Sequence, residues 1–324
     1  MLILGSGWRD QMGVKSRFQE FKVGIDPTVK EIKFMLSRVR KSPLSLIGTS
    51  IVVFYAVIAL LAPVLAPPNP SWTVTQISDP FAIPREKYQS TPSPPSELHP
   101  FGTAEWNYDL FYGCIWGTIT AFRVGLYVVF GSLAIGLFIG VVAGYYGGVI
   151  DELMMRFTDV IFAFPGLILA MALVTAFGRS LDNVMLALLL IGWPSYTRLI
   201  RGEILRIKQE DYVEAAKAVG CSDFRVIIRH VLPNSIYPIV VVASLDIGSL
   251  VLSAAALSFL GLGAPEYFAD WGQLISTSQN WMLKGWDYWY TFIIPGVFIF
   301  TFVLGWNLLG DAFRDILDPT LRRR

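Results

Sequence analysis

The segment from Asp211 to Pro238, DYVEAAKAVGCSDFRVIIRHVLPNSIYP, is polar and charged although it lies between two apolar runs. Its chemistry is that of noncovalent contact. Glu214 can accept hydrogen bonds or form an ion pair, Ala215 and Ala216 permit close approach, and Gly220 permits a sharp turn. This combination indicates a surface that another protein can hold, rather than a site that makes or breaks bonds.

Helix signals predict a first short helix in this segment. Asp211 is a good N-cap, and Glu214, three residues later, can reach back to its amide. The alanines favour the helix that follows, and Gly220 supplies the left-handed conformation that ends it. We therefore expect a short, rigid helix with small residues facing outward.

A second short helix is expected from Asp223 to about Val231, with Ser222 as its N-cap and Pro233 as its stop. The alternative is an amphipathic segment that lies on a membrane surface without a protein partner. That alternative predicts bulky apolar residues on one face, whereas the first helix offers mainly alanines. Docking into a groove of another protein is therefore the favoured interpretation.

The sequence contains no motif for catalysis. It has no GxxxxGK[ST] phosphate loop, no HExxH pair and no Ser/His/Asp arrangement that the topology below could assemble. His99 and His230 have no plausible metal partners nearby in sequence, and Cys114 and Cys221 fall on opposite sides of the expected membrane. The sequence predicts neither an enzyme nor a bound cofactor or metal. Its basic residues form no binding face, so no nucleic-acid partner is expected either.

The elements that must position these residues are membrane-spanning helices. Hydrophobic residues make up 54% of the chain and charged residues 16%, with a mean hydropathy of +0.53, far from the averages of soluble proteins. A helix needs about 20 apolar residues to cross the hydrocarbon core. We expect six such spans: Leu44–Ala66, Phe122–Ala143, Val160–Phe177, Val184–Ile200, Ile236–Phe259 and Thr291–Gly310. The predicted fold is an all-α polytopic membrane protein.

Positive charge sets the expected orientation. Of the 26 Lys and Arg residues, 21 lie in the two terminal tails, between the second and third spans, or in and beside the loop 201–235. The opposite side holds only four, Arg85, Lys87, Arg179 and Lys284, with Arg123 at the edge of the second span. Both termini and the Asp211–Pro238 segment are therefore predicted to be cytoplasmic, and the protein to lie in the cell membrane.

The external loop 67–121 is rich in proline. Nine of the nineteen prolines lie between Pro67 and Pro100, so an extended, non-helical segment is expected there. The loop can be a spacer that returns the chain to the second span. It can also cover the outer mouth or contact an external receptor.

Asp246 is the one acidic residue deep in an expected span. A carboxylate at membrane depth is costly unless it faces water, a cation or a hydrogen-bonding partner. Asp246, Ser249 and Ser253 are spaced by three and four residues, so they share one helix face. This face can line a pathway and attract cationic peptide termini. Alternatively, Asp246 can bond to a neighbouring helix or partner subunit, or it can be protonated.

The loop spacing resembles a known family. Glu214-Ala215-Ala216, Gly220 and Leu232-Pro233 resemble the EAA loop of binding-protein-dependent ABC importer permeases. The run Arg229-His-Val-Leu-Pro-Asn234 is similar to that of the dipeptide/oligopeptide/nickel branch.

Further motifs in the same order resemble the C-type subunits of that branch: His99-Pro-Phe-Gly-Thr103, Ala163-Phe-Pro-Gly166, Leu257-Ser-Phe-Leu-Gly-Leu-Gly263 and Asn307-Leu-Leu-Gly-Asp311. The likeness runs from about residue 30 to the end. At 106–110 the chain reads Trp-Asn-Tyr-Asp-Leu where the branch has GRDxL, a departure at the outer edge of the second span.

The resemblance implies the architecture of a type I ABC importer permease with a cytoplasmic coupling helix. It implies coupling to an ATPase through Glu214, Ala215, Ala216, Gly220, Leu232 and Pro233. It divides the chain into an N-terminal tail 1–43, a first span 44–66, the external loop 67–121, a five-helix transport core 122–310 with the coupling loop 201–235, and a C-terminal tail 311–324.

The implied partners are a homologous second permease subunit, two ABC ATPase subunits that carry ATP and Mg²⁺, an external substrate-binding protein and membrane lipid. Peptide is the expected cargo, with nickel or oligosaccharides as alternatives. A secondary transporter is the competing class. It predicts charges in several spans and an internal repeat, whereas only Asp246 is deep and no repeat is evident.

Overall fold

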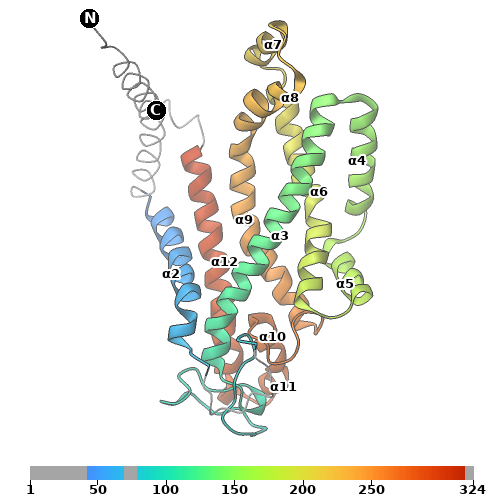
Figure 1. The fold of residues 1–324 in the computed structure, drawn as a ribbon. Helices are drawn as coiled ribbons and strands as arrows, with labels where there is room; N and C mark the ends of the chain where they lie inside the picture. The colour runs from blue at the N-terminus through green and yellow to red at the C-terminus, as the bar shows by residue number, and fades with distance from the viewer. Residues whose placement is uncertain (1–41, 69–78, 318–324) are drawn as a thin grey trace, which may run out of the picture.

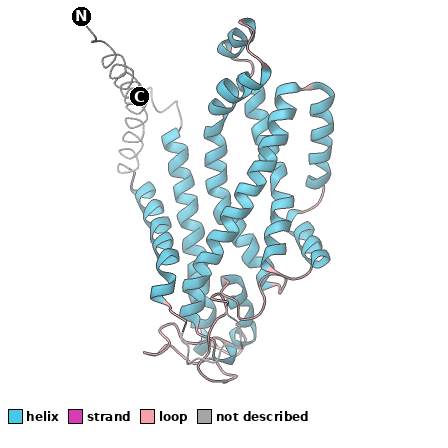
Figure 2. Ribbon diagram, viewed as in Figure 1, coloured by secondary structure: helices cyan, strands magenta, loops and turns pink. Residues whose placement is uncertain are grey.

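The computed structural model describes residues 42–68 and 79–317. In these ranges every regular element is helical (Figure 2), with only isolated β-bridges beside the helices. Residues 1–41 of the expected N-terminal tail and 318–324 of the expected C-terminal tail lie outside the described residues. The all-α fold predicted from the sequence is confirmed.

Five helices carry most of the described chain: α2 (Pro43–Leu65), α3 (Leu110–Tyr146), α6 (Leu181–Ile207), α9 (Leu232–Phe259) and α12 (Tyr290–Leu317). The shorter helices are α4 (Gly148–Phe162), α5 (Gly166–Phe177), α7 (Asp211–Ala218), α8 (Asp223–Val226), α10 (Trp271–Thr277) and α11 (Gln279–Met282). Two 3₁₀ turns, η1 (Glu105–Asn107) and η3 (Trp286–Tyr288), and a π-helical turn, η2 (Ile227–Val231), complete the set.

Among the described helices, five are long and apolar enough to cross a membrane: α2, α3, α6, the run Asp223–Phe259 and α12. The pair α4 and α5 qualifies only when taken together, which gives six spans if the pair counts as one. The two helices are bent by 83°. The expectation of one continuous helix over Val160–Phe177 is therefore wrong. Pro165 lacks an N–H group and restricts the backbone of Phe164, so the helix breaks there.

Helix α3 is longer than the expected span Phe122–Ala143. It begins at Leu110, because the Asp109 carboxylate accepts a hydrogen bond from the Tyr112 N–H at 2.6 Å and so caps the helix. Residues 110–121, expected to belong to the external loop, are helical.

Helices α3 and α6 pack with unusually close backbones at the centre of the bundle (Figure 1). A Cβ atom on Gly136 would lie 2.5 Å from the Tyr196 Cβ, and one on Gly144 would lie 2.9 Å from the Ile204 Cβ. Only glycine permits this approach, so the seam between α3 and α6 has little room to slide.

The two ends of the bundle differ. Helices α7 and α8 stand at one end, at the top of Figure 1, which we call the α7 end. The opposite end, which we call the capped end, carries residues 79–109, α10 and α11. There the rings of Tyr55, Trp271 and Phe302 meet edge-on, joining α2, α10 and α12.

The described part of the Pro-rich loop is folded onto the capped end. The Tyr112 hydroxyl donates to the Pro80 carbonyl at 2.6 Å, and Ala82 bridges to Phe268. His99 Nδ1 lies 2.6 Å from Asp109 Oδ2, with both side chains buried. These contacts tie the loop to α3 and to the chain before α10, so residues 79–109 do more than return the chain to the bundle.

Candidate functional site

Residues 208–231 contain α7, α8 and η2 and extend from the α7 end of the bundle (Figure 1). We call them the coupling segment, after the coupling loop 201–235 that the resemblance led us to expect. Helix α7 begins after Glu210, whose extended backbone makes it the N-cap. The expectation that Asp211 is the N-cap is wrong. The chain already turns at Lys208–Glu210, where the Glu210 carbonyl accepts from the Val213 and Glu214 N–H groups, so Asp211 falls in the first helical turn.

The turn after α7 has the expected left-handed glycine. Gly220 has a φ of +85°, and its N–H donates to the Lys217 carbonyl at 2.9 Å. The Cys221 N–H donates to the Ala216 carbonyl at 3.1 Å. These bonds close the C-terminus of α7, and a side chain at position 220 would strain that conformation.

The faces of α7 differ from the expectation. Val213 and Ala216 are buried, while Glu214 and Ala215 are exposed. Bulky apolar side chains are also exposed, because Val219 is 80% and Phe224 74% accessible. The prediction of an outer surface built mainly from alanines is therefore incomplete. Large apolar side chains exposed together at one projection are typical of an interaction site.

A hollow of about 390 Å³, open to solvent, lies between the end of α6 and α7. It is lined by Leu205, Lys208, Gln209, Glu214 and Lys217. Glu214, the acidic residue singled out in the sequence, thus faces a depression that carries two lysines.

The expected second short helix continues into α9 without a stop. Asp223–Phe259 is one continuous helical run, and Pro233 lies in the first turn of α9. The prediction that Pro233 ends the helix is wrong. The π turn before it explains this, since the Leu232 N–H bonds to the Ile227 carbonyl, and a proline one residue later enters a stretch already wound off the α pattern. Asn234 Nδ2 and Ser235 Oγ donate to the His230 and Val231 carbonyls.

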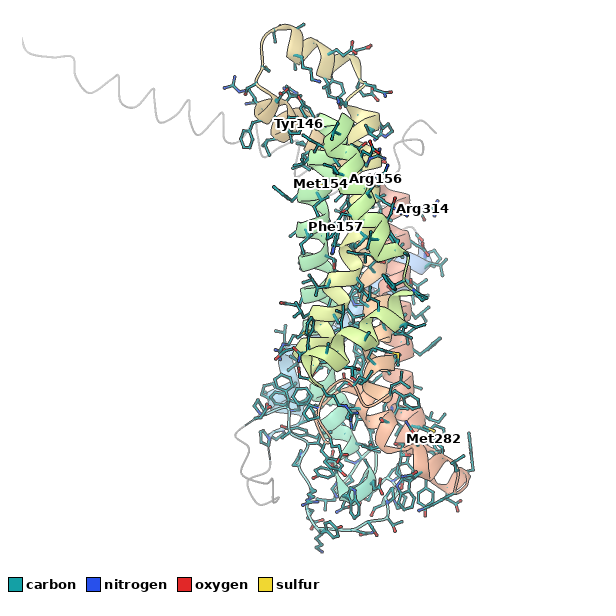
Figure 3. All side chains as sticks on the ribbon, turned by 90° about the vertical axis from the view of Figure 1, so that its right-hand side faces the viewer. Tyr146, Met154, Arg156, Phe157, Met282 and Arg314 are labelled. Carbon is teal, nitrogen blue, oxygen red and sulfur yellow. The ribbon has the colours of Figure 1, made fainter. Side chains whose placement is uncertain are left out.

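Ion pairs connect α4 to α6 at the same end. Arg201 makes two contacts to the carboxylate of Asp151, of 2.5 and 2.6 Å, and Arg198 lies 2.5 Å from Asp159. Figure 3 shows the side chains of this region, with Arg156, Met154 and Phe157 of α4 labelled below Tyr146 of α3. These pairings could not be predicted from local sequence patterns, because they join residues 39 and 50 positions apart.

The structure lines up the three expected pathway residues along α9. The Ser249 hydroxyl donates to the Asp246 carbonyl at 3.0 Å, and the Ser253 hydroxyl donates to the Ser249 carbonyl at 2.9 Å. Ser249 is exposed and the other two are partly buried. The Asp246 carboxylate lies beside the hydroxyl of Tyr196 in α6, a neighbour that the sequence analysis missed.

At the capped end, a buried carboxylate begins α10. Asp270 accepts from the Gln273 N–H at 2.8 Å and caps that helix. Burial raises the pKa of Asp270 to about 6, although the backbone of Gln273 and the Ser258 hydroxyl favour its charged form. Among the described residues, no group of three His, Cys, Asp or Glu side chains is arranged to hold a metal ion.

The geometry of a membrane-crossing bundle with a projecting segment agrees with the sequence comparisons. Residues 136–323 match the family of binding-protein-dependent transport system inner membrane components, which is more than half of the chain. The chain belongs to this permease family.

Residues 33–89 match the N-terminal transmembrane domain of oligopeptide transport permease C, which identifies the C-type branch. The chain is 37% identical over 286 residues to the dipeptide transport system permease protein DppC of Alkalihalophilus pseudofirmus, covering 88% of each. It is 40% identical over 278 residues to the probable D,D-dipeptide transport system permease protein DdpC of Escherichia coli, covering 86% of this chain and 88% of the relative.

A third relative is the glutathione transport system permease protein GsiD of Pectobacterium atrosepticum, 40% identical over 228 residues, covering 70% of this chain and 75% of the relative. Among solved structures, a chain of the MetNI methionine ABC transporter in an inward-facing conformation aligns with a TM-score of 0.53 and 18% identity. The alignment covers 64% of this chain and 97% of that one. At that identity the likeness shows the fold alone.

Proposed function

We propose that this chain is a permease subunit of an ATP-driven importer for short peptides, and that its coupling segment docks on a separate ATPase subunit. The relatives named for dipeptide and glutathione transport support the cargo class. The observation that carries the docking proposal is the projecting α7, with Glu214 at a solvent-open hollow. Val219, directly after α7, and Phe224, in α8, are exposed.

The proposed orientation places the α7 end in the cytoplasm, in line with the excess of Lys and Arg on that side. The proposed complex contains this chain, a homologous second permease subunit, two ATPase subunits that bind ATP and Mg²⁺, and an external substrate-binding protein. ATP binding closes the ATPases and moves α7. Because α7 is followed by the continuous helix Asp223–Phe259, its displacement reaches α9 and opens the pathway outward. Hydrolysis reverses the movement.

The contact with the ATPase is proposed to involve Glu214, Ala215 and Gly220, with Leu232 and Pro233 at the start of α9. Ala216 has a different role in this proposal, since it is buried and is not available for an outside contact. The pathway face is proposed to contain Asp246, Ser249 and Ser253.

A glycine pair tests the docking proposal. Gly220→Val forces a β-branched residue into a left-handed backbone, whereas Gly202→Val places the same side chain on α6, where a Cβ meets nothing within 4 Å. Both variants are reconstituted with the ATPase subunits and the binding protein. We expect Gly220→Val to insert normally but to lose roughly tenfold or more of the dipeptide uptake per ATP hydrolysed, and Gly202→Val to resemble wild type.

Glu214→Arg provides a second test, because it reverses the charge at the hollow without changing the backbone. Uptake per ATP is expected to fall as it does in Gly220→Val. Normal coupling in both variants, or dipeptide uptake by the purified permease without any ATPase, contradicts the proposal and favours a secondary transporter.

A further inference from the structure

Tyr145, the penultimate residue of α3, contacts the coupling segment through both its hydroxyl and its backbone carbonyl. Its side chain is only 4% exposed. Its hydroxyl donates to Asp223 Oδ1 at the start of α8 at 2.6 Å, and its carbonyl accepts from Lys208 Nζ at 2.5 Å. Lys208 precedes α7 and Asp223 follows it, so one residue of α3 holds both ends of the projection.

The ring of Tyr145 makes a third contact with the segment. Lys217 Nζ lies 5.0 Å from the ring centroid and Lys208 Nζ lies 5.5 Å from it, within the range of cation–π attraction. A phenol bound to a carboxylate is a strong hydrogen bond, because the acceptor is charged. Residues before, within and after α7 therefore converge on Tyr145.

The neighbouring residue provides a contrast. Tyr146 has the same side chain, but it is 54% exposed, and Figure 3 shows it near the end of α3. Its ring meets that of Tyr145 edge-on at 5.4 Å. The enclosed position of Tyr145 is therefore specific to that residue and is not a general property of the helix end.

Helix α3 is in turn closely packed against α6. The seam formed by Gly136, Gly140 and Gly144 brings the α3 backbone against Tyr196, Ile200 and Ile204. The last of these glycines directly precedes Tyr145. A force applied to Tyr145 thus acts on a helix that can hardly slide past its neighbour.

We propose that Tyr145 is a positioning residue that fastens the coupling segment to α3, so that displacement of α7 moves α3 and α6 together with α9. By chain connection alone, α7 is joined only to α6 and to the helix that contains α9. Tyr145 adds a third helix to the moving unit. This inference rests on the proposed function, in which α7 receives the movement of the ATPase.

The test uses the complete transporter in proteoliposomes, with radiolabelled Ala-Ala, its binding protein and ATP. Tyr145→Phe removes only the hydroxyl, and Tyr146→Phe is the matched control. We expect Tyr145→Phe to take up roughly tenfold less dipeptide per ATP hydrolysed, the scale of one lost hydrogen bond to a charged group, and Tyr146→Phe to equal wild type. Equal coupling in wild type and Tyr145→Phe overturns the proposal.

Asp223 supplies an independent pair of variants, which decides the question if Tyr145→Phe does not accumulate in the membrane. Asp223→Asn keeps an acceptor for the phenol and should remain close to wild type, whereas Asp223→Ala should lose coupling as Tyr145→Phe does. In the double variant Tyr145→Phe with Asp223→Ala, no further loss is expected, because both changes remove the same bond. Additive losses show that the two residues act separately and overturn the proposal.

Gly220→Val, measured in the same preparation, distinguishes failure of the docking function from failure of the fastening role of Tyr145. Loss of coupling in Gly220→Val with normal coupling in Tyr145→Phe and Asp223→Ala removes the fastening role and leaves the docking function intact. Normal coupling in all three removes the docking function as well.

Discussion

The α7 end and the capped end of the bundle hold their polar groups in different surroundings. At the capped end several polar groups are buried and paired, as in the contact of 2.6 Å between His99 and Asp109. At the α7 end, Glu203 and Arg206 pair near the surface, and Phe224 is exposed. Buried pairs hold one geometry, because breaking them leaves an unpaired group, whereas exposed groups can change partners at little cost. The buried pairs of the capped end thus favour a fixed shape, whereas the exposed outer groups of the α7 end, unlike the buried Tyr145 beneath them, can exchange contacts.

The largest expected effect is the difference in stability between two variants, each of which loses a large side chain at one end of the bundle. Trp271 is buried among Tyr55, Phe298 and Phe302, and its indole N–H donates to the Cys114 carbonyl at 3.0 Å. Trp271→Ala should cost about 3–5 kcal/mol of stability. Phe224→Ala should change stability by less than about 0.5 kcal/mol. Thermal unfolding of the detergent-purified protein measures both.

The order of the two variants should reverse when binding to the ATPase subunits is measured, with Phe224→Ala affected more than Trp271→Ala. Phe224→Ala should release the ATPase subunits more readily during affinity purification, because an exposed apolar contact is lost. A large loss of stability in Phe224→Ala would contradict the distinction between the two ends.

A smaller effect is expected from the helix-capping carboxylates. Asp109→Ala removes the cap of α3 and leaves His99 without this partner, so a loss of about 3 kcal/mol is expected. The control is Asp211→Ala in the exposed first turn of α7, where less than about 1 kcal/mol is at stake. Similar unfolding temperatures for the two variants would show that burial at the capped end adds nothing.

Asp270 gives the capped end a dependence on pH. Its pKa is raised from 3.8 to about 6 by burial, so the folded state binds the proton more tightly than the unfolded state. Stability should therefore be highest below about pH 4, decrease as the pH rises to about 6, and stay level above that. Asp270→Asn should remove this decrease, and Asp287→Asn, at an exposed position, should keep it. Unfolding temperatures across pH 4–8 provide the measurement.

The smallest expected effect concerns Asp246, midway between the ends. If its carboxylate attracts cationic termini, Asp246→Asn should lower uptake of a cationic dipeptide by about threefold relative to a neutral one, at equal membrane abundance, as expected for a partly screened charge contact. Unchanged uptake of both dipeptides would leave the contact with Tyr196 as its role.

Local signals in the sequence predicted part of this structure. The apolar runs indicated the spans, and Gly220 indicated the end of α7, because both depend on properties of a few neighbouring residues. The cap was misassigned to Asp211, because capping preferences favour Asp over Glu, whereas Glu210 is the N-cap by its backbone conformation and makes no side-chain capping bond. The prediction that Pro233 ends the second short helix was wrong. A proline normally ends a helix, and the π turn that accommodates this one has no clear sequence signal.

The contacts that fix the site could not be predicted from the sequence. Tyr145 and Asp223 are 78 positions apart, and no period or motif links them. The break between α4 and α5 was also missed, because a proline within an apolar run is compatible with a straight or a bent span. The exposure of Val219 and Phe224 beside the buried Val213 and Ala216 depends on the three-dimensional arrangement of the segment, which short sequence patterns do not encode.

The π turn Ile227–Val231 has a consequence for every residue that follows it. Such a turn holds one residue more than an α turn, and one residue corresponds to about 100° of rotation about the helix axis. The π turn, which lies several helical turns before Asp246, Ser249 and Ser253, therefore sets the direction around the helix axis in which these side chains point. Deleting one residue from the wide turn would keep the composition of α9 intact, yet swing its polar stripe toward a different neighbour.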